Sequence, residues 1–268
     1  MKKNTYFTIL RIVALIGALA VIVLLLFSSL GQKTAYDNNI LFVVDLSYSM
    51  NAKDITSVEG WRSKVEGKIS RLDAAKEIIK QIVEVWGEAN YGLVIFSQSA
   101  TQYVPLTADT WTFMDYIKDV NTGLLPGGGT DWNSLQKIFS GDKTSYAKII
   151  FISDAEALAS STKYLVPGTK SLATAKKYFI GVGTEEGGNP TLPNGTIMKM
   201  NWKNIITSFD VQTATTISKV LNAKLFQVEN VNNMDSVIGQ IVSSSRTFLH
   251  SEVQLLVVVL WVFILLVL

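Results

Sequence analysis

The sequence predicts an α/β domain with a doubly wound, mostly parallel sheet, flanked by two hydrophobic membrane anchors. Three observations predict this arrangement. Short apolar runs alternate with stretches of helical periodicity, which is the order expected of a parallel sheet covered by helices. Several apolar runs have no polar face, as expected for strands buried on both sides. Two much longer apolar stretches lie near the ends of the chain.

The first anchor is predicted at residues 1–32. The stretch from Ile12 to Gln32 carries no charge and is long enough to cross a bilayer. The basic residues before it also suit a secretory signal peptide, but residues 27–31, Phe-Ser-Ser-Leu-Gly, contain no clear small-x-small cleavage site. We therefore expect an uncleaved anchor.

The second anchor is predicted at residues 248–268, and the folded domain between the two anchors at residues 38–247. From Val253 onward the chain is apolar except for Gln254. As a helix this run rises about 24 Å, slightly less than the thickness of a hydrocarbon core. The sequence thus predicts a transmembrane helix that spans with some mismatch.

The charges near the first anchor predict its orientation. Lys2, Lys3 and Arg11 should keep the N-terminus in the cytoplasm, which places the domain on the extracytoplasmic side of the cell membrane. Without these three residues, the basic residues nearly balance the 22 acidic ones. The pI of 8.6 therefore reflects the anchor, and nucleic-acid binding is not expected.

The residue types that are missing or rare exclude several chemistries. The chain has no cysteine, so disulfides, thiolate metal sites and thiol catalysis are excluded. Its one histidine, His250, lies in the second predicted anchor. A Ser-His-Asp hydrolase or a histidine-rich zinc site in the folded domain is therefore excluded as well.

The elements of the domain follow from the apolar patterning. Strands are predicted at residues 39–45, 91–96, 101–104, 148–153, 178–182 and 225–228. Helices are predicted at residues 71–86, 109–120, 132–139, 213–222 and from 234 onward.

Two stretches and one residue type complete the expected organisation. Residues 51–70 are expected to form a polar surface loop. Residues 184–204, which contain Asn194-Gly195, are expected to form an inserted loop or small β-hairpin. The tryptophans of the domain are expected to be mostly core or helix-packing residues: Trp61, Trp86, Trp111, Trp132 and Trp202.

Polar side chains follow the first predicted strand at alternate positions. Asp45 ends the apolar run, and Ser47 and Ser49 come next. Carboxylate and hydroxyl oxygens at the end of a parallel strand suit a hard cation such as Mg²⁺. The pattern alone is weak, because Asp and Ser are also common in turns and helix caps.

Two further segments strengthen the metal-site hypothesis. Thr130 follows three glycines, and Asp154 directly follows the strand predicted at 148–153. In the strand order 3-2-1-4-5-6, the first and fourth strands are neighbours, so Asp45 and Asp154 should face one another with Thr130 above them. Two carboxylates brought together in this way repel each other unless a cation lies between them.

These three segments, in this order, resemble the metal-ion-dependent adhesion site of von Willebrand factor type A domains. The chain shows Asp-x-Ser-x-Ser at residues 45–49, Gly-Gly-Thr at 128–130 and Ile-Ser-Asp at 152–154. Four further segments are similar to recurring sequence motifs of the bacterial subgroup associated with aerotolerance (Bat) operons: residues 71–76, 92–96, 105–109 and 180–184. The resemblance implies a Mg²⁺ (or Mn²⁺) site with five ligand positions: Asp45, Ser47, Ser49, Thr130 and Asp154.

The chain departs from the family pattern at two positions. The family usually has glycine between the two serines, where this chain has Tyr48, and glycine after the later aspartate, where this chain has Ala155. Tyr48 is expected to crowd or cover the rim of the site. Ala155 is expected to restrict the backbone after the ligand.

The function implied is that of a membrane-anchored protein-binding module rather than an enzyme. Its metal would capture an acidic residue of a partner protein within a membrane assembly, and the resemblance implies other von Willebrand type A proteins and a MoxR-type AAA+ ATPase as further partners. A metal-dependent phosphatase or hydrolase that uses a metal-bound water is the alternative, although no general base is evident in the sequence. A structural role with the ligand positions empty is a third possibility.

Overall fold

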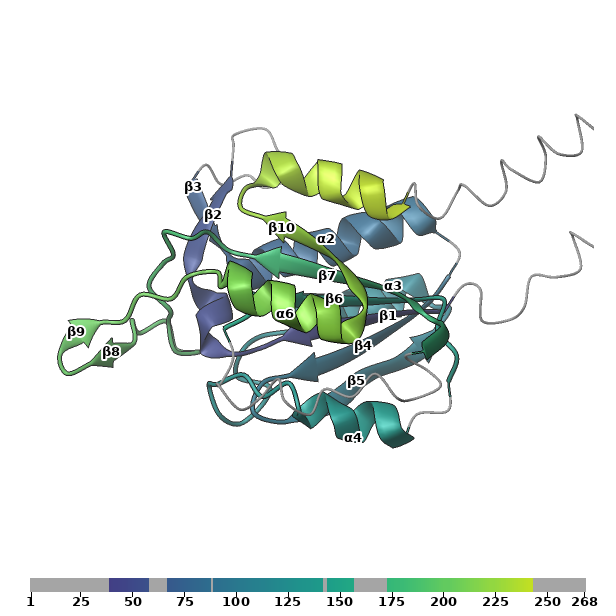
Figure 1. Cartoon of the computed structure of the whole chain (residues 1–268), viewed down its shortest axis with the longest axis horizontal. Coiled ribbons are helices and arrows are strands. Elements are labelled where there is room, and N and C mark those ends of the chain that lie inside the picture. Colours follow the sequence, from purple (N-terminus) through teal and green to yellow (C-terminus); the bar gives the residue numbers. More distant parts are fainter. Residues whose placement is uncertain (1–38, 58–66, 88, 142–143, 157–172, 243–268) are drawn as a thin grey trace, which may run out of the picture. The chain divides into compact units, whose positions relative to one another are not determined.

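A six-stranded sheet forms the centre of the domain in the computed structural model (Figure 1). The structure describes residues 39–57, 67–87, 89–141, 144–156 and 173–242. Across the sheet the strands follow the order β10-β7-β6-β1-β4-β5, and all are parallel to their neighbours except β5, which runs antiparallel to β4. The strands are β1 (Asn39–Asp45), β4 (Asn90–Phe96), β5 (Ala100–Thr107), β6 (Lys148–Ser153), β7 (Lys176–Val182) and β10 (Ala223–Val228).

The predicted α/β class and strand order are both confirmed. When only the strands of the central sheet are counted along the chain, the order is 3-2-1-4-5-6. β1 therefore lies between β6 and β4, with Val44 opposite Ile152 and Asp45 opposite Phe96. Because the winding direction reverses between β1 and β6, their carboxyl ends border the crevice where such sheets bind ligands.

Helices cover both faces of the sheet. One face packs against α2 (Arg71–Trp86), α3 (Thr110–Asp119) and a helix that begins at residue 231, whereas the other packs against α4 (Ser134–Gly141) and α6 (Val211–Leu221). Successive β1 side chains enter the two cores in turn, as expected from the period of a strand. Each large apolar side chain buried in this way stabilises the fold by about 1.5–3 kcal/mol.

Side-chain caps set the starts of three helices. Ser70, Asp109 and Asp210 each accept a hydrogen bond from the backbone N–H three residues later, at the N-termini of α2, α3 and α6. The prediction for α2 is confirmed at both ends. Helix α4 begins two residues later than predicted, because the side chain of Asp131 accepts from the backbone N–H of Asn133 in a preceding turn.

The prediction of a loop at residues 51–70 is wrong. β2 (Lys53–Ser57) pairs antiparallel with β3 (Gly67–Ser70) in a separate two-stranded sheet. Three of the five β2 side chains are buried, including that of Asp54. A polar sequence without a long apolar run conceals such a strand, since its inward-facing residues are not the usual apolar ones.

The inserted segment between β7 and α6 contains the predicted hairpin, although its ladder lies later in the chain. β8 (Lys199–Met200) pairs antiparallel with β9 (Lys203–Asn204). Asn194-Gly195 forms a separate turn, enclosed by a single bridge between Thr191 and Ile197. Asn194-Gly195 thus correctly predicts a turn, but the two-stranded β8–β9 hairpin lies elsewhere in the segment.

The tryptophan prediction is only partly correct, and the anchor prediction stays a prediction. Trp132 is fully buried and Trp86 packs against the core, but Trp111 and Trp202 are exposed, and Trp61 lies outside the described residues. The predicted anchors at 1–32 and 248–268 also lie outside those residues. Within the part of the chain that the structure describes, no helix has the length and apolar character needed to cross a membrane.

Candidate metal centre

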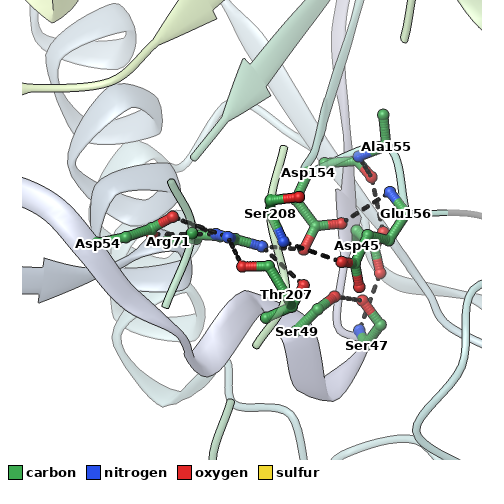
Figure 2. A network of polar contacts seen from close by, with 12 residues as sticks. Asp45, Ser47, Ser49, Asp54, Arg71, Asp154, Ala155, Glu156, Thr207 and Ser208 are labelled. Carbon is green, nitrogen blue, oxygen red and sulfur yellow. Dashed lines mark hydrogen bonds and ion pairs between the residues drawn. The ribbon is translucent and has the colours of Figure 1, made fainter. Parts of the chain in front are cut away.

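The first segment of the site turns back on itself directly after β1. The backbone N–H of Ser47 donates to Asp45 Oδ1 at 2.8 Å, and a short 3-10 helix, η1 (Tyr48–Asn51), follows. The hydroxyls of Ser47 and Ser49 lie 2.9 Å apart, and both serines and Asp45 are buried. Alternate side chains of this turn thus bring one carboxylate and two hydroxyls together, as Figure 2 shows.

The glycine-rich loop delivers Thr130 to the same place. The Thr130 hydroxyl lies 3.4 Å from Asp45 Oδ2 and is buried. The Tyr48 backbone N–H donates to the carbonyl of Gly128, and a Cβ atom added to Gly128 would come within 2.3 Å of the Tyr48 ring. Any side chain at position 128 would therefore force the Tyr48 ring to move, and glycine lets the loop pass this close to η1.

The end of β6 supplies the second carboxylate and an unexpected link to the first. The Ser153 hydroxyl donates to Asp45 Oδ2 at 2.7 Å, so the last residue of β6 orients the last residue of β1. Asp154 follows and accepts from the backbone N–H of Glu156 at 3.1 Å. The structure thus brings together all five predicted ligand residues, and it adds Ser153.

Arg71 is a second residue of the site, besides Ser153, that was not predicted from the sequence. Its guanidinium is fully buried and forms ion pairs with Asp54 and Asp154, each at 2.7 Å (Figure 2). It also donates to the hydroxyl and the carbonyl of Thr207. One signal could have found it, because the helical period places Arg71 on the same buried stripe as Ala75 and Ile78.

The two aspartates of the site differ in their electrostatics. Burial raises the pKa of Asp45 to about 7, and the charge of Asp154 adds to this, while hydrogen bonds from Ser153 and Ser47 offset only part of the shift. Burial lowers the pKa of Arg71, but the hydrogen bonds and charges of Asp54 and Asp154 outweigh it, so the pKa is raised overall. Arg71 thus stays charged beside Asp154.

The residues present fit a small hard cation. Asp45 is a fully buried carboxylate that forms no ion pair with a basic side chain in the described part of the chain. Among the described residues, no group of three or more His, Asp or Glu side chains is arranged so that it could hold a metal ion, so a metal would depend on hydroxyl oxygens. Ser47, Ser49 and Thr130 are of the oxygen type that Mg²⁺ accepts alongside water.

A cavity of about 380 Å³ opens next to these oxygens. Burial and the charge of Asp154 raise the pKa of Glu156, which lies at the cavity wall and accepts from the backbone N–H of Ser208 at 3.1 Å. The cavity is lined by η1, the glycine loop and the inserted segment. Its lining residues are Tyr48, Ser49, Gly128, Gly129, Thr130, Glu156, Pro190, Met198, Ile205, Thr207 and Asp210.

Comparison with known families agrees with this fold. Residues 40–156 match the profile of the von Willebrand factor type A domain, a segment that includes all five predicted ligand positions. The part of the chain from β1 to just beyond β6 is thus similar to a von Willebrand factor type A domain. The sequence has no significant match among curated proteins.

Solved structures that resemble the domain include two from Bacteroides. BatB from Bacteroides thetaiotaomicron is 20% identical, with a TM-score of 0.62, and the match covers 77% of this chain and 98% of that one. An aerotolerance-related membrane protein from Bacteroides fragilis is also 20% identical, with the same coverages and a TM-score of 0.61. The predicted resemblance to Bat-like proteins is thus confirmed at the level of the fold.

A third structure is more distant. Proximal thread matrix protein 1 from the mussel byssus, described as having a zinc-occupied metal-ion-dependent adhesion site, is 14% identical with a TM-score of 0.51. The match covers 77% of this chain and 47% of the mussel protein. At such identities these three structures show a shared fold.

Both departures from the family pattern have structural consequences. Tyr48 lies at the rim of the cavity, against Gly128, as expected. Ala155 adopts a φ of 61°, in the left-handed region that favours glycine. The backbone at position 155 therefore has the conformation that glycine would adopt there. Alanine is strained in this conformation.

Proposed function

We propose that the domain binds Mg²⁺ (or Mn²⁺) through Asp45, Ser47, Ser49, Thr130 and Asp154, and that the metal captures an acidic side chain of a partner protein. One observation carries the proposal. Asp45 is a fully buried carboxylate with a pKa raised to about 7, and it lies beside the hydroxyl groups of Thr130 and Ser153 from two other segments. A buried, unpaired carboxylate of this kind is stabilised by a cation.

The surroundings of the site leave room for a ligand on the metal. Arg71 is shared between Asp54 and Asp154, so it offsets part of their charge, and Asp45 is the carboxylate of the site that has no basic partner among the described residues. The hydroxyls of Ser49 and Thr130 face a cavity large enough for a side chain. When bound, the metal would supply an open coordination position for a carboxylate oxygen.

Hydrolysis is the second candidate function, and one residue bears on it. Glu156 lines the cavity with a raised pKa, as a general base could. However, one of its oxygens accepts from the backbone N–H of Ser208, which fixes the carboxylate at the wall. Turnover of p-nitrophenyl phosphate that is lost in both Asp45→Asn and Glu156→Gln would establish the hydrolase instead.

We also propose that the protein acts at the cell membrane, with the domain on the extracytoplasmic side. Support comes from the two predicted anchors and from the aerotolerance-related relative, which is described as a membrane protein. Other von Willebrand type A proteins and a MoxR-type AAA+ ATPase are the proposed members of the assembly. Protease added to intact spheroplasts should digest the domain, whereas full protection would reverse the orientation.

The metal is tested by calorimetry on the full chain in detergent. Wild-type protein should bind Mg²⁺, and Asp45→Asn should not, because the variant lacks the negative ligand. Asp115→Asn, at an exposed surface ion pair on α3, is the matched control and should bind as the wild type does. Undiminished affinity in Asp45→Asn would contradict the assignment.

A further inference from the structure

We infer that the β8–β9 hairpin is a second contact surface for the ligand of the metal site, and that this ligand is a protein segment with apolar side chains next to its acidic residue. The inference rests on the proposed function of the metal site and extends it to the chemistry of the partner. It is carried by the exposure of the hairpin, the strain in its turn, its continuity with the cavity, and its charge.

The inserted segment exposes an unusual amount of apolar surface. Trp202 is 96% exposed, and Met200 and Ile206 are 68% and 69% exposed. Ile197, in the same segment, is also exposed. Large apolar side chains that gather on one protruding element mark an interaction site more often than single scattered ones do.

The turn that presents Trp202 is strained. Asn201 and Trp202, the two central residues of the hairpin turn, have φ values of 51° and 68°. Such a turn favours Asn-Gly, because a bulky residue is disfavoured at positive φ. Strained positions of this kind cluster at functional sites. Glycine at position 202 would adopt this φ without strain. The strain is therefore the cost of presenting an indole side chain at the tip of the hairpin.

The hairpin continues directly from one wall of the cavity. Met198 and Ile205 line the cavity, and the Ile205 backbone N–H donates to the Met198 carbonyl at 3.0 Å. β8 and β9 follow this pair in the ladder, and Figure 1 shows that they extend away from the central sheet. A segment whose acidic side chain reaches the buried hydroxyls would therefore run along the hairpin as it leaves the cavity.

The base of the segment is fixed to the site itself. Arg71 donates to Thr207, and the backbone N–H of Ser208 donates to Glu156 (Figure 2). These contacts hold the cavity wall in place relative to Asp154. The hairpin and the metal ligands thus form one continuous surface rather than two separate ones.

The charge of the hairpin suits an acidic partner. Lys199 and Lys203 lie on either side of the turn and are exposed, and residues 188–209 contain no acidic residue. Glu185 and Glu186 are at the start of the segment, before the cavity wall. Lysines around an aromatic tip also suit a lipid surface, but continuity with the cavity favours a protein segment.

The test compares Trp202→Gly with the wild type. Glycine accepts the positive φ, so this variant removes the indole without straining the turn. The control is Trp111→Ala, which removes another exposed tryptophan, 75% exposed, at the start of α3. Thr107, at the end of β5, pairs with Tyr91 at the start of β4. The α3 helix therefore begins near the amino-terminal ends of the parallel strands, whereas the site lies at their carboxyl ends.

A random peptide library is selected on the full chain in detergent with MgCl₂ and counter-selected on Trp202→Gly. We expect peptides that contain Asp or Glu with apolar neighbours, and we expect them to bind Trp202→Gly at least about tenfold more weakly, as for an aromatic hot spot. Binding to Trp111→Ala should match the wild type. EDTA and Thr130→Ala should each abolish binding.

The contrary outcomes are distinct. If acidic peptides need Mg²⁺ but bind Trp202→Gly equally, or if no peptide survives counter-selection, the hairpin inference is overturned while the metal site stands. If binding needs Trp202 but not the metal, the proposed function fails and the shared surface with it. Trp202-dependent binding to phosphatidylglycerol vesicles, without selected peptides, would assign the hairpin to lipid instead.

Discussion

The ends of β1 and β6 present two buried aspartates that the protein treats differently. Asp154 is paired with Arg71, whereas Asp45 has only hydroxyl and amide donors around it. The first carboxylate shares a cationic partner with Asp54, and the second has no cationic partner among the described residues. One aspartate of the site thus belongs to an internal ion-pair network, while the other is available to a cation from solution. Four experiments test this difference.

Removing the internal cation should cost the most. Arg71→Met leaves Asp54 and Asp154 buried without their partner, so we expect a loss of about 3–5 kcal/mol in the free energy of unfolding. Urea unfolding measures it. Lys80→Met, at a surface pair with Glu77 in the same helix, should change stability by less than about 0.5 kcal/mol. A similarly small loss in Arg71→Met would show that Asp154 does not depend on Arg71.

The charge of Asp45 should make the metal-free domain less stable as pH rises. Its folded-state pKa of about 7 lies above the ordinary value of 3.8, so between these values the folded state holds a proton that the unfolded chain has released. The contribution of Asp45 to the free energy of unfolding should therefore be greatest below about pH 4. Between pH 4 and pH 7 it should fall by a few kcal/mol, at about 1.4 kcal/mol per pH unit. Unfolding in EDTA across this range should show the slope in the wild type but not in Asp45→Asn.

The same proton should compete with the metal. Mg²⁺ requires the ionised form of Asp45, so its affinity should fall about tenfold per pH unit below pH 7 and level off above it. Calorimetry at a series of pH values measures this. An affinity that does not change between pH 5 and pH 8 would mean that Asp45 is already ionised without metal.

The smallest effect should come from the backbone beside Asp154. Ala155→Gly relieves the left-handed strain and should stabilise the domain by about 1 kcal/mol. Ala52→Gly, at an equally buried alanine with a φ of −63°, should instead destabilise it by about 0.5–1 kcal/mol. Equal effects of the two substitutions would remove strain as the explanation.

The ligand cluster could be predicted from the sequence because its parts lie at the ends of strongly patterned strands. Once β1 and β6 were recognised as buried parallel strands, their order in the sheet brought Asp45 and Asp154 together. Thr130 could be added because the three glycines before it marked a loop of close approach. For these residues, local pattern and topology agree.

Arg71 and Trp202 could not be predicted, for two different physical reasons. The role of Arg71 depends on Asp54, which lies in a short strand without apolar patterning and meets Arg71 only in the folded chain. The exposure of Trp202 depends on a hairpin that extends away from both cores. Composition predicts that a tryptophan is buried on average, and only the tertiary structure shows which one is not.

The hydrogen bonds of Arg71 have a consequence for ligand selectivity. A guanidinium has five N–H donors, and those of Arg71 are all directed at Asp54, Asp154 and Thr207. Its donor capacity is therefore saturated, and it has none left for a newcomer. An incoming carboxylate or phosphate cannot recruit this arginine without breaking a bond that holds the site together. The most basic group near the cavity is thus unable to act as an anion receptor, and discrimination among anions falls to the bound metal and the cavity walls.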